Sequence, residues 1–572
     1  MTTVNIDIPG RTHFVPADLD GRRWENLQPL YEALLDRDLQ CSGCLEEFLL
    51  DRSELDAAAR EAQANLYIAM TCHTEDEQAK RAYLDFVEEV EPELKKAGFA
   101  LDKKIAGCPQ AADLDPKRYG VMLRDIAADV EIFREENVAL QMEDTKLGQR
   151  YAETCGAMTV TWDGQERSLP QMSRYQEETD RAVREATWRL VAERRHADHE
   201  KLSGIFDEMI GLRHRMARNA RFENYRDYMF TAKHRFDYAP ADCEAFHRAA
   251  EEVCVPVFRA LNRERGEALG VGELRPWDLA VDIKGRAPLR PFETVDELVE
   301  RTSKLYHRMS PALGEMFDRL RGGGRLDLDA RMGKAPGGYQ ESRDRSRTPF
   351  IFMNASGVQR DLETMIHEAG HAFHSMLSRP EPLLHYRHAP IEFAEVASMS
   401  MELLAHRYLG EFYDDASAAR AKRRHLEEIS RLLPWIATID AFQHWLYTHP
   451  NHDREERRAY WLELDERFGA AVSWAGLEAY RATTWQRQLH LFEVPFYYIE
   501  YGIAQLGALQ LWLRSREDEQ DAIARYTKAL ALGGSRPLPE LFAAAGLTFE
   551  FDVETVRRLM DAVQEELQRL PM

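Results

Sequence analysis

Apolar residues recur at helical spacing along most of the chain. Residues 24 to 153 are rich in Ala, Leu, Glu and Arg, and they predict amphipathic helices with breaks near residues 41–44, Gly98 and residues 109–116. Helical spacing resumes from about residue 170 to residue 264. The pattern therefore predicts a mainly α-helical fold.

Two short stretches depart from the helical pattern. In residues 158–169, Val160 and Trp162 alternate with polar residues before Asp163-Gly164, a dipeptide typical of two-residue hairpin turns. The apolar run TPFIFMN, residues 348–354, predicts a strand with an open edge that an extended peptide can join. The rest of the glycine-containing segment 321–357 is expected to be a flexible binding loop.

Charge and composition limit the classes of molecule that the chain is expected to bind. The chain has 75 basic and 98 acidic residues, a net charge of −23, so nucleic acid and anionic membranes are poor partners. The sequence contains neither a signal-peptide pattern nor an apolar run long enough to span a membrane, which predicts a cytoplasmic protein. Seven scattered cysteines fit reduced thiols, and the pair Cys41 and Cys44 is expected to be structural because no second pair follows it.

The stretch TMIHEAGHAFHSML, residues 364–377, carries the clearest chemistry. His367 and His371 lie one helical turn apart on one face, where two imidazoles can bind one ion. Glu368 lies roughly 100° round the helix from His367, close enough to act on a ligand of that ion. Zinc bound by two histidines and one acidic residue keeps a fourth position for water, which is the arrangement of hydrolases.

Spacing alone leaves the third ligand open. The next helical pattern, residues 391–409, presents Glu392, Glu395 and Glu402 near one another on one face. His374 lies almost on the same face as His367, one turn beyond His371. We expect His374 to line the cleft or to support a ligand. The motif in which three histidines bind zinc would have a glycine at position 374 and its third histidine at position 377, where this chain has His374 and Leu377.

TMIHEAGHAFHS followed by APIEFAEVASMSME resembles the oligoendopeptidase F group of the thimet-oligopeptidase-like metallopeptidases. The resemblance continues through FIFMNASG, residues 487–511 and residues 526–547, in the expected order. It implies that Glu395 is the third ligand of a single zinc ion. It also implies a large two-lobed helical zincin of the gluzincin type, with a deep central channel and a small β-sheet beside the active-site helix. Residues 1–195 would form a helical N-terminal lobe and residues 196–572 the catalytic region.

The same resemblance assigns a second group of residues. It implies that His490 and Tyr501 support the tetrahedral intermediate of peptide hydrolysis. A further tyrosine of the family falls near Val494, where this chain departs from the pattern. Either Tyr497 or Tyr498 takes its place, or the contact is absent.

A third group is expected to bind the substrate. Phe350 and Phe352 lie in the predicted strand, which would hold a peptide backbone by edge pairing. Lys334, Gly337 and Tyr339 would belong to a loop over that peptide.

Together these features predict a zinc-dependent endopeptidase that hydrolyses internal bonds of short unfolded peptides by Glu368-assisted attack of zinc-bound water. One alternative is an exopeptidase of the same chemistry, similar to dipeptidyl carboxypeptidases. Another is a non-catalytic helical peptide-binding protein with a structural metal, which the presence of Glu368 disfavours because a structural site needs no general base. Short peptides are the expected partners, and the oligomeric state is left open.

Overall fold

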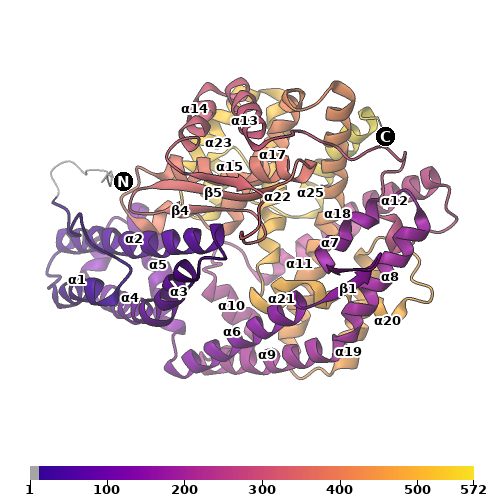
Figure 1. Cartoon of the computed structure of the whole chain (residues 1–572). Coiled ribbons are helices and arrows are strands. Elements are labelled where there is room, and N and C mark those ends of the chain that lie inside the picture. Colours follow the sequence, from indigo (N-terminus) through magenta and orange to yellow (C-terminus); the bar gives the residue numbers. More distant parts are fainter. Residues whose placement is uncertain (1–11, 572) are drawn as a thin grey trace. The chain divides into compact units, whose positions relative to one another are not determined.

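The computed structural model describes residues 12–571, and helices make up most of it (Figure 1). The prediction of a mainly helical fold is confirmed. Within the described range, strands form one sheet of two strands and one of three. None of the helices in this range is long and apolar enough to cross a membrane. The chain divides into two compact units, which are described separately.

Unit 1 comprises the described residues up to Glu131, residues 288–422 and residues 504–549. It contains the H-E-x-x-H helix. Its main helices are α1 (Trp24–Asp36), α2 (Ser42–Cys72), α3 (Glu77–Asp85), α4 (Glu91–Ala106), α5 (Pro116–Ile132), α13 (Val295–Met309), α14 (Pro311–Leu320), α15 (Gln359–Ser378), α16 (Leu384–Arg387), α17 (Ile391–Leu404), α23 (Glu519–Leu530) and α24 (Leu538–Ala544).

Unit 2 comprises residues 132–287, residues 423–503 and the described residues from Glu550 onward. The division between the units falls inside α18 and α22 and before the last residue of α5. The main helices with residues in this unit are α6 (Glu135–Gly156), α7 (Leu169–Met172), α8 (Arg181–Ala197), α9 (His199–Asn219), α10 (Tyr225–Ala232), α11 (Pro240–Ala249), α12 (Val255–Leu269), α18 (Asp415–Thr448), α19 (Arg454–Phe468), α20 (Glu478–Arg481), α21 (Leu489–Glu493), α22 (Tyr498–Glu517) and α25 (Val553–Arg569).

Of the local structural predictions, the hairpin is confirmed, and the helix break at Gly98 and the reduced state of Cys41 and Cys44 are wrong. The hairpin is confirmed as β1 (Thr159–Trp162) and β2 (Gln165–Ser168), and both turn residues, Asp163 and Gly164, have positive φ as a type I′ turn requires. The break near Gly98 is wrong, because α4 continues through it. One helical glycine costs only about 1 kcal/mol relative to alanine, which neighbouring turns can offset.

Cys41 and Cys44 are joined by a disulfide in the first turn of α2, so these two are not reduced thiols.

The three-stranded sheet lies in unit 1, in the segment that was expected to be mostly loop. It consists of β3 (Leu326–Asp329), β4 (Tyr339–Arg343) and β5 (Thr348–Ala355), in the order β3-β5-β4. The strand predicted at residues 348–354 is therefore confirmed as β5. Its predicted open edge is wrong, because β5 pairs in parallel with β3 and antiparallel with β4. β3 and β4 are the two edge strands, and β4 and β5 pack against α15 (Figure 1).

This topology corrects the substrate-binding role expected for Phe350 and Phe352. Both side chains are buried, in a cluster with Ile68 and Cys72 of α2. Tyr339 stacks on the Phe352 ring at a centroid distance of 4.8 Å. Because the β5 backbone is paired on both sides and these rings lie in the core, the two phenylalanines hold the sheet on α2.

Helices α15 and α17 approach each other closely at Gly370. The buried face of α15 carries apolar residues at helical spacing, among them Leu362, Ile366 and Phe373. A Cβ atom on Gly370 would lie 2.6 Å from the Ser398 Cα and 2.7 Å from the Ala397 carbonyl oxygen. Since such contacts are too short for real atoms, only glycine allows this helix spacing.

We therefore expect Gly370→Ala to destabilise the protein by about 1 to 3 kcal/mol, because α17 must move to accommodate one methyl group. Gly98→Ala in α4 is the matched control, since a Cβ there meets nothing within 4 Å. That substitution should stabilise the protein by up to about 1 kcal/mol. Urea unfolding measures both changes, and effects of the same sign would contradict the close approach.

Candidate metal centre

Three donor atoms from α15 and α17 come together in unit 1. The Glu395 Oε2 atom lies 3.4 Å from His367 Nε2 and 3.6 Å from His371 Nε2. All three donor atoms lie within 4.8 Å of one another. Zinc bonds of about 2.0 to 2.1 Å place the ligand atoms of a tetrahedral site roughly 3.3 Å apart. Of the three glutamates that spacing left open, Glu395 is the one in this group.

Two further side chains orient the donors. The Glu402 Oε1 atom lies 2.6 Å from His367 Nδ1, so the other ring nitrogen of His367 is directed to Glu395. The Ser398 hydroxyl donates a hydrogen bond to Glu395 Oε2 at 2.9 Å. The sequence did not assign these roles. The only sequence feature that pointed to a role for Glu402 was its position two helical turns after Glu395, on the same face of the helix.

Burial and neighbouring carboxylates shift the pKa values at this centre. Burial raises the pKa of Glu368 to about 7, against an opposing hydrogen bond from the Gln340 backbone amide. Burial alone would lower the pKa of His367, but the hydrogen bond with Glu402 and the negative charges of Glu402, Glu395 and Glu368 together outweigh it, and the pKa rises to about 9. For His371, burial lowers the pKa well below its usual value. A dication at the donor atoms would favour the ionised form of Glu368.

The donor set fits a zinc ion. Three carboxylates, those of Glu368, Glu395 and Glu402, lie around the imidazoles of His367 and His371 and give the site excess negative charge. Imidazole nitrogen and carboxylate oxygen are both ligands that zinc accepts. A dication would balance the carboxylates where solvent is largely excluded.

His374 does not belong to the donor group. Its ring lies edge-on to Phe393 at 6.1 Å, and its Nε2 atom has no hydrogen-bond partner among residues 12–571. Burial lowers its pKa to about 4. His374 is thus a neutral core residue of α15.

Of the residues expected in a loop over the substrate, Tyr339 begins β4, and Lys334 and Gly337 lie in the segment before it. The Lys334 ammonium is buried, 2.8 Å from Asp327 Oδ1, and it donates to backbone carbonyls, so Lys334 anchors the sheet and does not cover a peptide. Gly337 is exposed, with a φ of 98°. The Tyr339 hydroxyl lies 2.6 Å from Thr71 Oγ1, which directs this ring toward α2.

The residues predicted near residue 490 form one cluster in unit 2. The His490 ring lies 4.8 Å from Tyr498, 5.9 Å from Tyr497 and 6.2 Å from Tyr501. Burial lowers the pKa of His490. The Gln488 side-chain amide donates to His490 Nδ1 at 2.6 Å, which leaves the ring hydrogen on Nε2. His490 is therefore a neutral donor at Nε2.

A strained turn lies between His490 and the tyrosines of this cluster, and no sequence pattern indicated it. Phe496 has a φ of 62°, which costs of order 1 to 3 kcal/mol for a non-glycine residue. Its amide donates to Gln443 Oε1 at 2.6 Å. The buried Arg235 guanidinium donates to the Phe496 carbonyl and pairs with Glu500 at 2.7 Å. These contacts fix the backbone direction at Tyr497.

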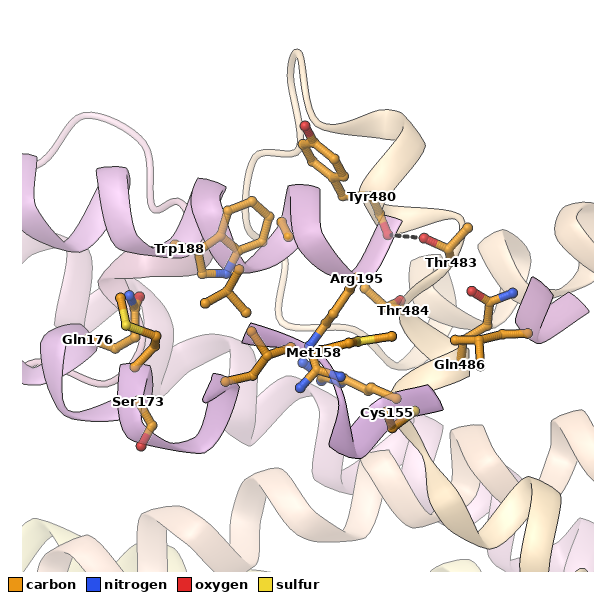
Figure 2. A pocket seen from close by; sticks show the side chains of 16 residues that line it. Cys155, Met158, Ser173, Gln176, Trp188, Arg195, Tyr480, Thr483, Thr484 and Gln486 are labelled. Atoms are coloured by element: carbon orange, nitrogen blue, oxygen red, sulfur yellow. Dashed lines mark hydrogen bonds between the residues drawn. The ribbon is translucent and has the colours of Figure 1, made fainter. Parts of the chain in front are cut away.

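Unit 2 also contains an apolar cavity of about 260 Å³ (Figure 2). Trp188 and Arg195 of α8 face it, together with Cys155, Met158 and Tyr480. Its described lining includes none of the predicted site residues. The cavity is therefore distinct from the residues discussed above.

Two histidines one turn apart, an intervening glutamate and a carboxylate from a second helix define the class of site, a metallopeptidase-type metal centre. Residues 174–560 match the model of Peptidase family M3, and the chain belongs to this family.

Three known proteins show the extent of the similarity. The oligoendopeptidase F homolog of Borreliella burgdorferi is 25% identical over 55% of this chain and 54% of its own length. Oligopeptidase PepF of Bacillus subtilis is 26% identical over 43% of this chain and 37% of its own. The chain thus spans about half or less of these relatives. The structure of PZ peptidase A with an inhibitor superimposes with a TM-score of 0.88 and 27% identity, over 96% of this chain and 97% of the other.

Metal content distinguishes the glutamates of α17. We expect Glu395→Ala to lose bound zinc, because one of three donors is removed. Glu392→Ala, on the same helix but outside the donor group, should keep it. Elemental analysis after dialysis measures both, and equal metal content in the two variants would mean that Glu395 is not a ligand.

Glu402→Gln tests the orienting contact. Loss of the carboxylate beside His367 Nδ1 should weaken zinc affinity by about 10- to 100-fold, as is typical for partners of ligating histidines. Competition with a chromogenic chelator measures the affinity. An unchanged affinity would show that Glu402 does not orient His367.

Proposed function

We propose that the chain is a zinc-dependent metalloendopeptidase that cleaves internal bonds of short, unfolded peptides. The observation that carries this proposal is the convergence of His367, His371 and Glu395 beside the buried Glu368. Membership of Peptidase family M3 supports a peptidase, and zinc dependence is general in that family. The likeness to PZ peptidase A over nearly the whole of both chains supports the same assignment.

His367 Nε2, His371 Nε2 and Glu395 Oε2 would hold one zinc ion. When bound, zinc supplies a Lewis acid that lowers the pKa of water from about 15.7 to about 7. Glu402 keeps His367 in the tautomer whose Nε2 lone pair is available to a metal. Ser398 similarly holds the Glu395 carboxylate in position.

Glu368 is the proposed general base and general acid. Its carboxylate takes a proton from the attacking water as the oxygen–carbon bond forms. It then gives this proton to the nitrogen of the departing amine as the peptide carbon–nitrogen bond breaks. The burial of Glu368 supports the role, because burial raises the pKa of its carboxyl group and so makes its carboxylate a stronger base toward the attacking water.

The edge of β4 is the proposed binding element for the peptide backbone. The Gln340 amide that reaches Glu368 belongs to this strand, so the edge that does not pair with β5 faces the general base. An extended peptide added there would place its carbonyl groups along that edge. This role replaces the one expected for β5.

His490 and Tyr501 are proposed to stabilise the negative charge that develops on the peptide carbonyl oxygen. Their proximity within unit 2 and the hydrogen on His490 Nε2 support donor roles. Tyr497 and Tyr498, whose rings also contact His490, are the candidates for the tyrosine that the chain lacks at Val494.

Glu368→Gln should retain zinc but lose peptide hydrolysis by roughly 10²- to 10⁴-fold, because the amide cannot take the proton. Glu363→Gln, one turn earlier on α15 and outside the donor group, is the matched control and should keep near-normal turnover. Hydrolysis of a fluorogenic peptide measures activity. Undiminished turnover in Glu368→Gln with full metal content would discredit the mechanism.

Peptides with acetylated and amidated ends distinguish endopeptidase from exopeptidase activity. We expect internal cleavage of such blocked peptides, because edge pairing with β4 requires no free terminus. Mass spectrometry identifies the products. Cleavage only of peptides with a free end, one or two residues from that end, would support the exopeptidase alternative.

A further inference from the structure

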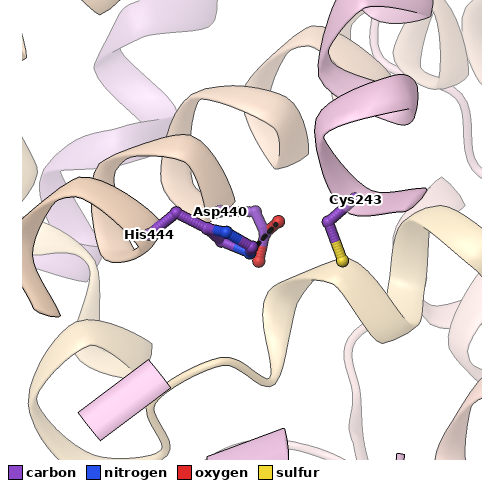
Figure 3. Close-up of side chains that lie close together, drawn as sticks. All are labelled: Cys243, Asp440 and His444. Carbon is purple, nitrogen blue, oxygen red and sulfur yellow. Dashed lines mark ion pairs between the residues drawn. The ribbon is translucent and has the colours of Figure 1, made fainter. Parts of the chain in front are cut away.

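A second cluster of potential metal ligands lies in unit 2, on α11 and α18. Each helix presents two such residues four positions apart, Cys243 and His247 on α11 and Asp440 and His444 on α18. Residues at this spacing project from one face of a helix. The sulfur, carboxylate and imidazole ligand atoms of Cys243, Asp440 and His444 all lie within 4.8 Å of one another (Figure 3).

One carboxylate oxygen is central to this cluster. Asp440 Oδ2 lies 2.8 Å from His247 Nε2 and 3.3 Å from His444 Nε2. In a tetrahedral site, zinc bonds of about 2.0 Å to nitrogen or oxygen and about 2.3 Å to one sulfur place the ligand atoms roughly 3.3 to 3.5 Å apart. The separations measured from Asp440 Oδ2 approach this geometry, and the His247 ring must shift to join Cys243, Asp440 and His444, whose ligand atoms already lie within 4.8 Å of one another.

The cluster is almost completely buried. Cys243 is 1% exposed, Asp440 0%, and His247 and His444 6% each. Aromatic rings border it, since Phe230 and Phe496 lie edge-on to His444 at 6.1 and 5.6 Å. Ionised and polar groups in such an environment require partners of their own.

The hydrogen bonds within residues 12–571 do not satisfy the cluster. Asp440 Oδ1 and His444 Nδ1 are buried without a hydrogen-bond partner in that range, and the contact of His444 Nε2 within the cluster is the ion pair with Asp440 Oδ2 at 3.3 Å. A buried polar atom that nothing binds destabilises the fold, because it has lost its hydrogen bonds to water. A bound ion satisfies buried atoms of this kind, as an ordered water does.

The charges of the four residues match a dication. A thiolate and a carboxylate together carry two negative charges, so one divalent ion and two neutral imidazoles make the cluster neutral. Sulfur, nitrogen and oxygen donors in one set select zinc or cobalt over magnesium and calcium.

We propose that unit 2 contains a structural metal site in which Cys243, His247, Asp440 and His444 bind a zinc-class dication. All four positions come from the protein, so no position is open for water or substrate. The ion joins α11 to α18 and stabilises the folded unit. This site is independent of the proposed peptidase centre, which has only three protein donors and a general base.

Metal content of a variant without the first centre tests the proposal. We expect His367→Ala/His371→Ala, loaded with zinc and dialysed, to retain one zinc ion per chain, while the unsubstituted chain retains two. Adding Cys243→Ser or Asp440→Asn should remove the remaining ion. A folded double variant without bound zinc would overturn the proposal and show a metal-free hydrogen-bonded cluster. Because no hydrolysis is measured, this result is separate from the fate of the proposed peptidase activity.

Cobalt substitution identifies the ligand directly, without a variant of the cluster. Cobalt bound in His367→Ala/His371→Ala should show a near-ultraviolet thiolate charge-transfer band, because sulfur ligates only at Cys243. Cys254→Ser is the matched control, since this buried cysteine lies outside the ligand group, and the band should persist in it. Absence of the band with cobalt bound, or its loss in Cys254→Ser, would contradict ligation by Cys243.

Discussion

The candidate peptidase centre depends on how closely α15 and α17 approach each other. Two histidines on one helix provide only part of a zinc site, and the remaining carboxylate must come from a neighbouring element. Gly370 permits the approach because any side chain would collide with the Ala397 and Ser398 backbone. Ligand distances tolerate errors of only about 0.2 Å, so this helix spacing determines whether Glu395 completes the site.

Much of the fold and part of the candidate site could be predicted from the sequence, because they rest on local patterns. Helical spacing indicated the helices, and Asp163-Gly164 indicated the hairpin. The four-residue separation of His367 and His371 was sufficient to place both on one face. The choice of Glu395 required the resemblance to a known family, since three glutamates of that helix satisfied the spacing equally well.

The rest depended on contacts between segments that are distant in the chain. The segment around β3 and β4 is rich in polar and glycine residues, so no apolar alternation indicated that it pairs with β5. The buried Lys334 carries its charge into the sheet because backbone carbonyls accept its hydrogen bonds. The contact of Glu402 with His367 likewise exists only after the two helices pack. Local sequence patterns do not encode such pairings.

The central claim is that one ion binds between α15 and α17. Anomalous diffraction at the zinc absorption edge, from crystals of the unsubstituted chain, tests it most directly. The account predicts a peak about 2 Å from His367 Nε2, His371 Nε2 and Glu395 Oε2. Zinc-containing crystals without a peak at this point, or with these three side chains directed apart, would contradict it.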